Sequence, residues 1–512
     1  KVATSEFHDY YEAQLQMHLI CLRYFFEFTD MQGEKVYYGN YEFDKECITN
    51  RDRMFDCPQN LREEEMFEVP QWAANKVVYQ IFPSRFAATQ PVDKELWYKA
   101  PITPMDDLHG NLRGIIEHLD YIKDLGIDVV YLTPIFKSNS CHKYDTIDYY
   151  QVDPSFGTTE DLKELVQKSH ERGMKVVLDA VYNHTGREFF AFQDILEKGE
   201  KSKYLDWYFI DELPPRGEWG EIPNFKCFGY YGGMPKLNLK NPEVEKYITD
   251  VACYWIKECD IDGWRLDVGD EISHFFWKNF RKAVKAVKKD MLIIGEIWHY
   301  AGDFLEGDEW DTVMNYPFYL NLIDLLADEK ITVSQFVQNL GYLKGRLHKN
   351  CYPLMWNLID SHDTARFLHL CNDNKKKQHL AAAFQLLLPG MPMIYYGDEY
   401  AMPGANDPDC RRGMYWDEEY QDKEMYEWYK RLIQVRKSHA CIVEGELAGS
   451  VTEDEEGTVV LIRKNGEETI AMIFNCSSSA KKFNEYTQKY NLLTENTFDG
   501  NVEGFDAAVI VL

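Results

Sequence analysis

The stretch Gly263-Trp264-Arg265-Leu266-Asp267-Val268-Gly269-Asp270 alternates large apolar side chains with charged ones, and the fold can be worked out from it. It follows a helical pattern at 251–259, and residues 262–268 have the alternation of a strand. Arg265 and Asp267 are two residues apart, so on a strand their side chains point to the same side. Burying two charges costs several kcal/mol unless they pair or line a site. Taken alone, such a pair is more often structural than functional.

The strand at 262–268 is one of eight similar runs. Near-continuous apolar strands that alternate with helices indicate a parallel sheet buried on both faces. Helical patterns such as 112–125 and 159–172 fall between most of the runs. Eight repeats predict an α/β protein with a closed (β/α)8 TIM barrel over residues 71–430. The runs occupy 77–82, 128–132, 175–179, 262–268, 291–296, 312–315, 354–359 and 393–396.

Two departures from this rhythm predict additional structure. After Val181 the chain reaches its next clear helix only near Glu243, through a stretch rich in glycine, proline and aromatic residues. So long a connection predicts a small subdomain inserted after strand 3, at 185–240. Over 431–512 the apolar pattern returns to period two, with an Asn465-Gly466 turn between two apolar runs. That pattern predicts a C-terminal β-sandwich.

The N-terminal segment, 1–70, predicts a partial β domain. Aromatic and polar residues alternate at 22–28 and 36–38, around a turn-like 30–33, as in a β-hairpin. The segment is too short for a complete sandwich, so we expect a fragment of a larger domain. Lys1 is not a start methionine, so we expect that processing or truncation has removed the residues before it.

Composition limits the partners and the compartment. The chain has 512 residues with 56 basic and 85 acidic side chains, a net charge of −29. Such a surface argues against nucleic acid and anionic membranes and suits a neutral substrate. The 15% of aromatic residues mildly favours carbohydrate, although a large core accounts for most of them. Twelve scattered cysteines without a CxxC pair predict reduced thiols and a cytoplasmic protein; a removed secretory leader would also fit.

Polar side chains gather where five of the predicted strands end. In a (β/α)8 barrel, reactive residues sit at the carboxyl ends of the strands. Any one of these residues alone would be an ordinary surface or capping residue. Barrel closure, however, brings the ends of the fourth, fifth and seventh strands around a common centre. The set consists of Asp179, Asn183, His184, Arg265, Asp267, Glu296, Ser361, His362, Asp363, Asp398 and Glu399.

Three carboxylates, an arginine and two histidines suit glycoside hydrolysis. The reaction needs one carboxylate and one carboxylic acid across a glycosidic bond, and a separation of ~5–5.5 Å gives retention through a covalent intermediate. Arg265 would keep Asp267 ionised as the nucleophile. Glu296 lies among apolar neighbours, which would raise its pKa and keep it protonated as the acid. Asp363 would oppose the positive charge that develops on the ring, and the histidines would bind sugar hydroxyls.

Four motifs in order resemble those of the α-amylase superfamily. They are Asp-Ala-Val-Tyr-Asn-His at 179–184, Gly-Trp-Arg-Leu-Asp at 263–267, Gly-Glu-Ile-Trp at 295–298 and Ser-His-Asp at 361–363. The resemblance covers most of the chain. It implies the same three catalytic residues as the chemistry does: Asp267, Glu296 and Asp363. The substrate-binding residues that it implies are Tyr144, His142, Asp179, His184, Arg265, His362, Asp407 and Arg411.

A fifth motif narrows the resemblance to one branch. Met-Pro-Lys-Leu-Asn at 234–238 is similar to a motif of neopullulanases, cyclomaltodextrinases and maltogenic amylases, as are 199–207, 314–317 and 406–411. Alone, this motif would be an ordinary loop returning to the barrel. In that branch, the residues matching Asp407 and Arg411 contact a sugar two or more units back from the cut.

Three departures from the branch limit which of its properties we expect in this chain. Residues 86–91 have few oxygen ligands where the branch often binds calcium, so we expect no cofactor and no metal there. Residues 268–271 read Val-Gly-Asp-Glu where the branch commonly has Val-Ala-Asn-Glu, which leaves α-1,4 against α-1,6 preference open. The short N-terminal domain puts a homodimer and a cyclodextrin preference in doubt.

The sequence therefore predicts a retaining α-glucan hydrolase. Its expected substrates are α-1,4 bonds, with α-1,6 bonds as a further option, in maltooligosaccharides, cyclodextrins, pullulan or starch, with some transglycosylation. One rival is an α-1,6-glucosidase or glucosyl isomerase on the same fold, which the motif at 234–238 argues against. The other is a catalytically inactive glucan-binding relative. That rival would be marked by the loss of a carboxylate, and all three are present.

Overall fold

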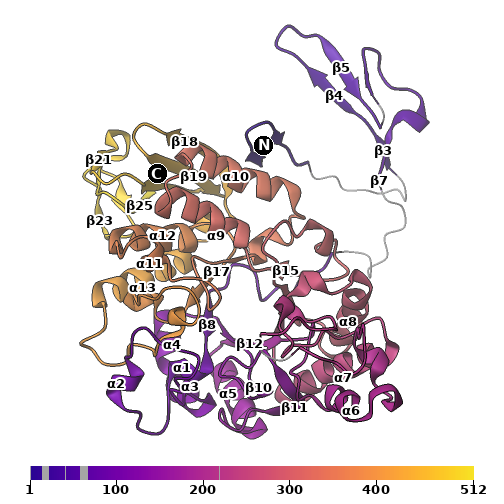
Figure 1. Cartoon of the computed structure of the whole chain (residues 1–512). Helices are drawn as coiled ribbons and strands as arrows, with labels where there is room; N and C mark the ends of the chain where they lie inside the picture. Colours follow the sequence, from indigo (N-terminus) through magenta and orange to yellow (C-terminus); the bar gives the residue numbers. More distant parts are fainter. Residues whose placement is uncertain (1, 14–21, 41, 58–66, 218–219) are drawn as a thin grey trace. The chain divides into compact units, whose positions relative to one another are not determined.

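The computed structural model describes residues 2–13, 22–40, 42–57, 67–217 and 220–512 (Figure 1). The chain forms two compact units. One is Tyr11–Glu68, and the other joins Val2–Tyr10 to Val69–Leu512.

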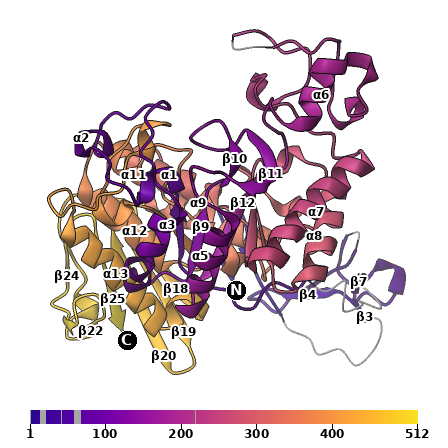
Figure 2. The same ribbon diagram turned by 90° about the horizontal axis from the view of Figure 1, so that it is seen from below.

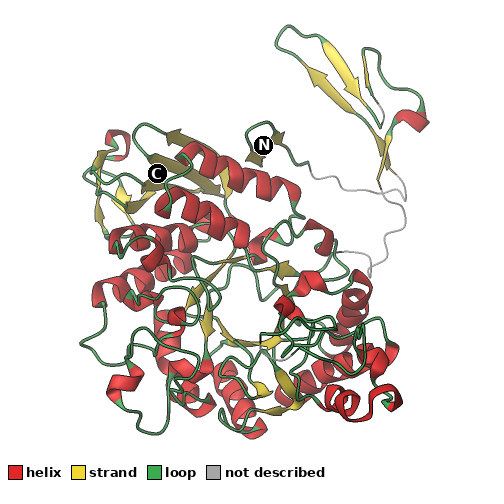
Figure 3. Cartoon of the chain, viewed as in Figure 1, coloured by secondary structure: helices red, strands yellow, loops and turns green. Residues whose placement is uncertain are grey.

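Eight parallel strands form the centre of the larger unit (Figures 1 and 3). The sheet has the order β15-β14-β13-β12-β9-β8-β17-β16. A parallel bridge between Met314, just after β15, and Trp356 closes it into a barrel. The predicted (β/α)8 barrel is thus confirmed, with strands in all eight predicted places. The strands are β8 (Val78–Ile81), β9 (Val129–Leu132), β12 (Lys175–Ala180), β13 (Gly263–Leu266), β14 (Leu292–Gly295), β15 (Thr312–Val313), β16 (Trp356–Asn357) and β17 (Met391–Tyr395).

The barrel is a packed core that helices cover. Side chains from successive strands, including Val78, Tyr131, Val177 and Ile294, form one buried cluster. The predicted helix at 112–125 is divided at His118, whose ring bonds the carbonyl of Gly114. The main helices are α3 (Leu112–Glu117), α4 (Leu119–Leu125), α5 (Thr159–Glu171), α7 (Pro242–Cys259), α8 (His274–Val287), α9 (Tyr316–Leu322), α10 (Val333–Arg346), α12 (Lys375–Leu387) and α13 (Lys423–Ser438).

Two excursions lie on the carboxyl side of the strands. Between β9 and α5, the antiparallel pair β10 (Phe136–Ser138) and β11 (Thr146–Val152) encloses the turn that carries Tyr144. The predicted insertion follows β12 and contains α6 (Phe190–Lys198), which Figure 2 shows projecting from one end of the barrel. A bridge between His184 and Lys236 ties the end of this insertion to its beginning.

The C-terminal region is antiparallel, as predicted. Its main sheet has the order β18-β19-β20-β25-β22-β23, and a second sheet pairs β21 with β24. Ala471 and Ile473 of the main sheet share a buried cluster with Val502 of the second sheet and with Phe483, which directly follows β21. The strands are β18 (Glu446–Glu453), β19 (Thr458–Asn465), β20 (Glu468–Asn475), β21 (Lys481–Lys482), β22 (Tyr490–Asn491), β23 (Asn496–Thr497), β24 (Asn501–Val502) and β25 (Asp506–Val511).

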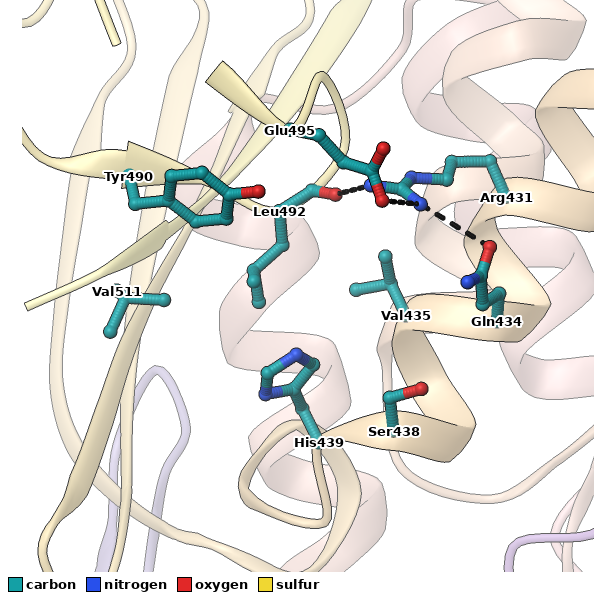
Figure 4. Close-up of a pocket in the computed structure, with 9 residues that line it drawn as sticks. All are labelled: Arg431, Gln434, Val435, Ser438, His439, Tyr490, Leu492, Glu495 and Val511. Carbon is teal, nitrogen blue, oxygen red and sulfur yellow. Dashed lines mark hydrogen bonds and ion pairs between the residues drawn. The ribbon is translucent and has the colours of Figure 1, made fainter. Parts of the chain in front are cut away.

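This sheet packs beside α13 and leaves a hollow of about 380 Å³ (Figure 4). Arg431 of α13 crosses one side of it, donating to the carbonyl of Leu492 and pairing with Glu495 at 2.7 Å. Val435 and Val511 supply apolar lining. Arg431 therefore links the barrel helix to the C-terminal sheet.

The smaller unit is a pair of small antiparallel sheets. The predicted hairpin is present as β4 (Phe26–Thr29) and β5 (Lys35–Tyr38), with β6 (Phe43–Asp44) beside β5. The second sheet pairs β3 (Leu22–Tyr24) with β7 (Phe55–Cys57).

Residues 2–10 pack with the larger unit, whereas the sequence predicted that they belong to the N-terminal β domain. β1 (Ala3–Thr4) and β2 (Asp9–Tyr10) form a short pair that belongs to the larger unit. Lys344 of α10 donates to the carbonyl of Val2 at 3.1 Å. An added Cβ at Gly341 would meet the carbonyl oxygen of Thr4 at 1.7 Å, so glycine permits this approach.

Candidate active site

One buried guanidinium lies at the centre of the predicted cluster. β13 pairs in register with β12, which sets Arg265 opposite Asp179. The Nη1 atom of Arg265 lies 3.0 Å from an oxygen of Asp179 and 3.0 Å from Oδ1 of Asp267. Its Nη2 atom lies 2.8 Å from Oε2 of Glu296 and 3.9 Å from Oδ2 of Asp363. The fourth, fifth and seventh strand ends thus meet around Arg265, whose side chain is fully buried.

Four carboxylates contact this guanidinium, and burial raises the pKa of Asp179, Asp267 and Glu296. Burial raises the pKa of Asp179 to about 6. It raises the pKa of Glu296 as well, in the direction expected for an acid. Burial also raises the pKa of Asp267 well above its usual range, and Arg265 opposes that rise without cancelling it. The expectation that Arg265 alone keeps Asp267 ionised is therefore too simple, because one charge is shared among four carboxylates.

The predicted nucleophile, Asp267, and the predicted acid, Glu296, have different hydrogen-bonding surroundings. Oδ2 of Asp267 is buried and has no hydrogen-bond partner within the described protein. Both oxygens of Glu296 accept hydrogen bonds, Oε2 from the Val268 amide at 3.0 Å and Oε1 from the Trp298 indole at 3.3 Å. Asp267 therefore has an oxygen available to bond another atom, and Glu296 is held in place.

Tyr144, His142 and His362 form an aromatic wall beside the carboxylates. The rings of Tyr144 and His362 are stacked, 5.6 Å apart and within 4° of parallel, and Tyr144 also stacks on His142. The Tyr144 hydroxyl bonds His362 and donates to Asp179 at 3.1 Å. Burial lowers the pKa of both histidines, that of His362 well below its usual range. At neutral pH they are uncharged hydrogen-bonding groups.

His184 closes the site on the side of the insertion. Its Nε2 atom bonds the carbonyl of Tyr144 at 3.0 Å, and its ring stacks on Phe228 at 5.1 Å. Burial lowers the pKa of His184 to about 4, so it too is neutral near pH 7. Its Nδ1 atom is buried without a partner among the described residues.

Arg411 connects the loop of the seventh strand to that of the eighth. Its Nη1 atom lies 2.8 Å from Asp407 and its Nη2 atom 3.3 Å from Oδ1 of Asp363. Its Nε atom donates to the carbonyl of His362 at 2.7 Å. The pair Asp407–Arg411 thus adjoins the catalytic cluster directly, which the sequence alone did not predict.

Several residues of the site were missed at the sequence level. The Tyr131 hydroxyl donates to Asp179 at 2.7 Å, and the Gln80 amide lies 2.7 Å from Nδ1 of His362. Arg265 also contacts the sulfur of Met314 at 3.5 Å. Gln80 had a signal, because it is the polar residue inside an apolar strand. Tyr131 and Met314 had none, since both occur in runs that fit a packed core.

A (β/α)8 barrel with three carboxylates and an arginine at its strand ends is the architecture of a glycoside hydrolase. Comparison with known proteins gives the family. Residues 80–445 match the family described as "Alpha amylase, catalytic domain", and residues 1–59 match "Alpha amylase, N-terminal ig-like domain". The chain therefore belongs to the α-amylase family.

Individual relatives are similar over nearly the whole chain. A cyclomaltodextrinase of Geobacillus thermopakistaniensis is 44% identical over 484 residues, which cover 94% of this chain and 82% of that protein. Neopullulanase 2 of Thermoactinomyces vulgaris is 41% identical over 481 residues, 93% of this chain and 81% of that protein. A solved structure of a cyclomaltodextrinase, 38% identical, matches with a TM-score of 0.93 over 100% of this chain and 90% of that chain.

Proposed function

We propose that this chain hydrolyses α-1,4-glucosidic bonds of short α-glucans, with retention of configuration at the anomeric carbon. Maltooligosaccharides, cyclodextrins, pullulan and starch are the candidate substrates. Cleavage of α-1,6 bonds is proposed as a secondary activity. The observation that carries the proposal is the contact of one buried guanidinium with both Asp267 and Glu296. Relatives named cyclomaltodextrinase, neopullulanase and maltogenic α-amylase support the substrate class.

In the first step, the free oxygen Oδ2 of Asp267 attacks the anomeric carbon. The bond from that carbon to the glycosidic oxygen breaks, the electron pair stays on the oxygen, and Glu296 gives it a proton. Asp363 opposes the positive charge that develops on the sugar ring. The product of this step is a glucosyl ester of Asp267 and a shortened glucan.

In the second step, the Glu296 carboxylate takes a proton from water. The resulting hydroxide oxygen bonds the anomeric carbon, and the bond to Asp267 breaks, which restores both carboxyl groups. Two inversions at one carbon give net retention. A sugar hydroxyl in place of water would give transglycosylation.

The neutral side chains around the carboxylates are suited to a sugar. Tyr144 offers an aromatic face, and His142, His184 and His362 offer uncharged nitrogen atoms for hydroxyl groups. Asp179 and Arg265 lie deepest, where they would hold the same sugar. Asp407 and Arg411 would bind a unit further back, on the side away from the cut.

We propose that the reaction needs no cofactor, since two carboxyl groups and water account for every proton and electron pair in it. At 86–91, where the branch often binds calcium, two oxygens already have donors. The carbonyl of Phe86 accepts from the Trp416 indole, and the hydroxyl of Thr89 accepts from Asn111 at 3.1 Å. A calcium dependence would appear as a loss of activity in chelator that calcium restores.

We also propose that the protein is located in the cytoplasm. The cysteines whose side chains the structure describes are free thiols, five of them buried. No described helix has the length and apolar character needed to cross a bilayer. Fractionation of the source cells tests the compartment, and sedimentation over a concentration series tests whether the chain is a monomer or a homodimer.

The decisive experiment on the function is product analysis on maltotriose, β-cyclodextrin, pullulan and starch, side by side. Proton NMR of the first products gives the anomeric configuration. The proposal expects α-anomers and cleavage of at least one of these glucans. The inactive-relative alternative expects none, and an α-1,6-glucosidase or glucosyl isomerase expects little cleavage of maltotriose.

A further inference from the structure

A second cluster of buried charges lies next to the active site, outside the reaction described above. It consists of Asp360, Arg366 and Asp398, each no more than 1% exposed. The Nη1 atom of Arg366 lies 2.9 Å from Oδ1 of Asp398, and its guanidinium stacks over the ring of Tyr395 at 3.9 Å. Oδ2 of Asp360 accepts the Phe367 amide at 2.7 Å.

The cluster has one guanidinium for two buried carboxyl groups, and the Nη2 atom of that guanidinium is itself buried without an acceptor. Oδ1 of Asp360 and Oδ2 of Asp398 are both buried without a hydrogen-bond donor. The two carboxyl groups nevertheless contact each other, so a proton on one of them would form a hydrogen bond to the orphaned oxygen of the other. One guanidinium cannot neutralise both, and an unpaired buried charge costs several kcal/mol.

We infer that Asp360 and Asp398 share one proton, and that the resulting neutral-acid pair with Arg366 is the positioning device for Asp363 and Arg411. The proton is on Oδ2 of Asp398, which donates to Oδ1 of Asp360. Both orphaned oxygens are then satisfied, and the net charge of the cluster falls from −1 to zero. Burial, with the charge of Asp360 as the next cause, raises the pKa of Asp398 well above its usual range, in agreement.

Arg366 connects the cluster to the loops that carry Asp363 and Arg411. Its amide donates to the carbonyl of Gly404 at 3.0 Å, and its Nε atom donates to the carbonyl of Cys410 at 3.1 Å. Cys410 directly precedes Arg411, which contacts Asp363. Asp360 lies at the other end of the loop that carries Asp363. The cluster therefore fixes both loops that meet at this carboxylate.

The other titratable groups around the cluster include several tyrosines, Glu399, the thiol of Cys410 and the guanidinium of Arg411. Tyr395 and Tyr396 lie under Arg366, and the buried Tyr429 faces both aspartates. Glu399 turns instead to the hydroxyls of Tyr79 and Tyr121, both at 2.6 Å. None of the tyrosines supplies a second positive charge.

The first test is infrared spectroscopy of the whole chain with ¹³C-labelled aspartate carboxyl groups, recorded at pH 8. A neutral carboxylic acid gives a C=O stretch that a carboxylate does not. We expect such a band in the wild type, its loss in Asp398→Asn and its shift in Asp360→Asn. A wild-type spectrum without that band at pH 8, or a band that both variants leave unchanged, would overturn the shared proton.

The second test compares variants of Asp398 by activity, and it alone rests on the proposed hydrolase function. Asp398→Asn mimics the neutral acid, so we expect kcat/KM within about threefold of wild type. Asp398→Ala removes both the acceptor of Arg366 Nη1 and the donor to Asp360, so it should lower kcat by about 10²-fold, with a smaller change in KM. Equal losses in the two variants would show that an ionised Asp398 is required. If the wild type cleaves no glucan, the proposed function fails while the infrared result still decides the proton.

Discussion

The Nη1 atom of Arg265 lies 3.0 Å from Oδ1 of Asp267, two residues along the chain from it, while Oδ2 of Asp267 has no partner in the described protein. The guanidinium thus orients the carboxylate by one oxygen and leaves the other free. A nucleophile needs this division, because the attacking oxygen must be free of other hydrogen bonds and its carboxylate must not rotate.

Replacing Arg265 tests this arrangement. We expect Arg265→Met to lower kcat/KM by about 10²–10³-fold and the free energy of unfolding by about 3–5 kcal/mol, since it leaves buried carboxylates without a cation. Arg265→Lys keeps the charge but cannot contact all the carboxylates, so its loss should be intermediate. Kinetics on maltotriose and urea unfolding measure the two effects. A fully active Arg265→Met variant would contradict the role of Arg265.

The buried Asp179 predicts a dependence of stability on pH. Its folded pKa of about 6 exceeds the ordinary value of 3.8, so the folded state holds its proton more tightly. The stability from this proton is complete below about pH 3.8 and is lost as pH rises through 6. We expect the unfolding free energy of Asp179→Asn, relative to wild type, to rise by about 2 kcal/mol between pH 4 and 7.

Asp153 is the matched control, because its shift has the opposite sign. Hydrogen bonds from Ser155 and the Ser138 amide, with the Lys143 ammonium at 2.9 Å, hold the pKa of this buried carboxylate below its ordinary value of 3.8. Its contribution is present above about pH 4 and lost only below it. Asp153→Asn should therefore keep a constant difference from wild type between pH 5 and 7. The same trend in both variants would count against a raised pKa at Asp179.

Asp407 and Arg411 should separate binding from catalysis. Asp407 contacts the Nη1 atom of Arg411, whereas Asp363 contacts its Nη2 atom, so Asp407→Ala should raise KM for maltotetraose by about tenfold and change kcat little. Arg411→Ala also removes a partner of Asp363 and should lower kcat by about 10–10²-fold. Steady-state kinetics on maltotriose and maltotetraose distinguish these outcomes. An equal fall in kcat for both variants would show that Asp407, too, acts on Asp363.

Gly269 explains one departure from the branch. A Cβ there would lie 2.8 Å from Cζ2 of Trp310, so Gly269→Ala should destabilise the fold by about 1–3 kcal/mol. Trp310→Phe removes the clashing atoms, and the double variant should recover part of that loss. Gly449→Ala is the control, since its nearest neighbour is 3.7 Å away. Urea unfolding of the four variants would contradict this account if Gly269→Ala matched Gly449→Ala.

The sequence predicted the barrel because strands buried on both faces must be apolar, which makes runs such as 129–132 and 292–295 visible. It predicted Asp179, Arg265, Glu296 and Asp363 as one cluster because barrel topology alone brings those strand ends together. It did not predict the contact of Arg411 with Asp363, which depends on how two loops fold over the rim. The sequence also did not predict the raised pKa of Asp267, because burial and the sharing of one guanidinium depend on distances in the folded chain.

The most direct test of the central claim is to trap the glucosyl ester on Asp267. Glu296→Gln lacks the acid but still carries the nucleophile, so α-maltosyl fluoride, whose leaving group needs no proton, should form the ester faster than water removes it. Peptide mass spectrometry should then find one maltosyl group on Asp267, and none in Asp267→Asn with Glu296→Gln. A label on another residue, or inverted product without any ester, would contradict the account.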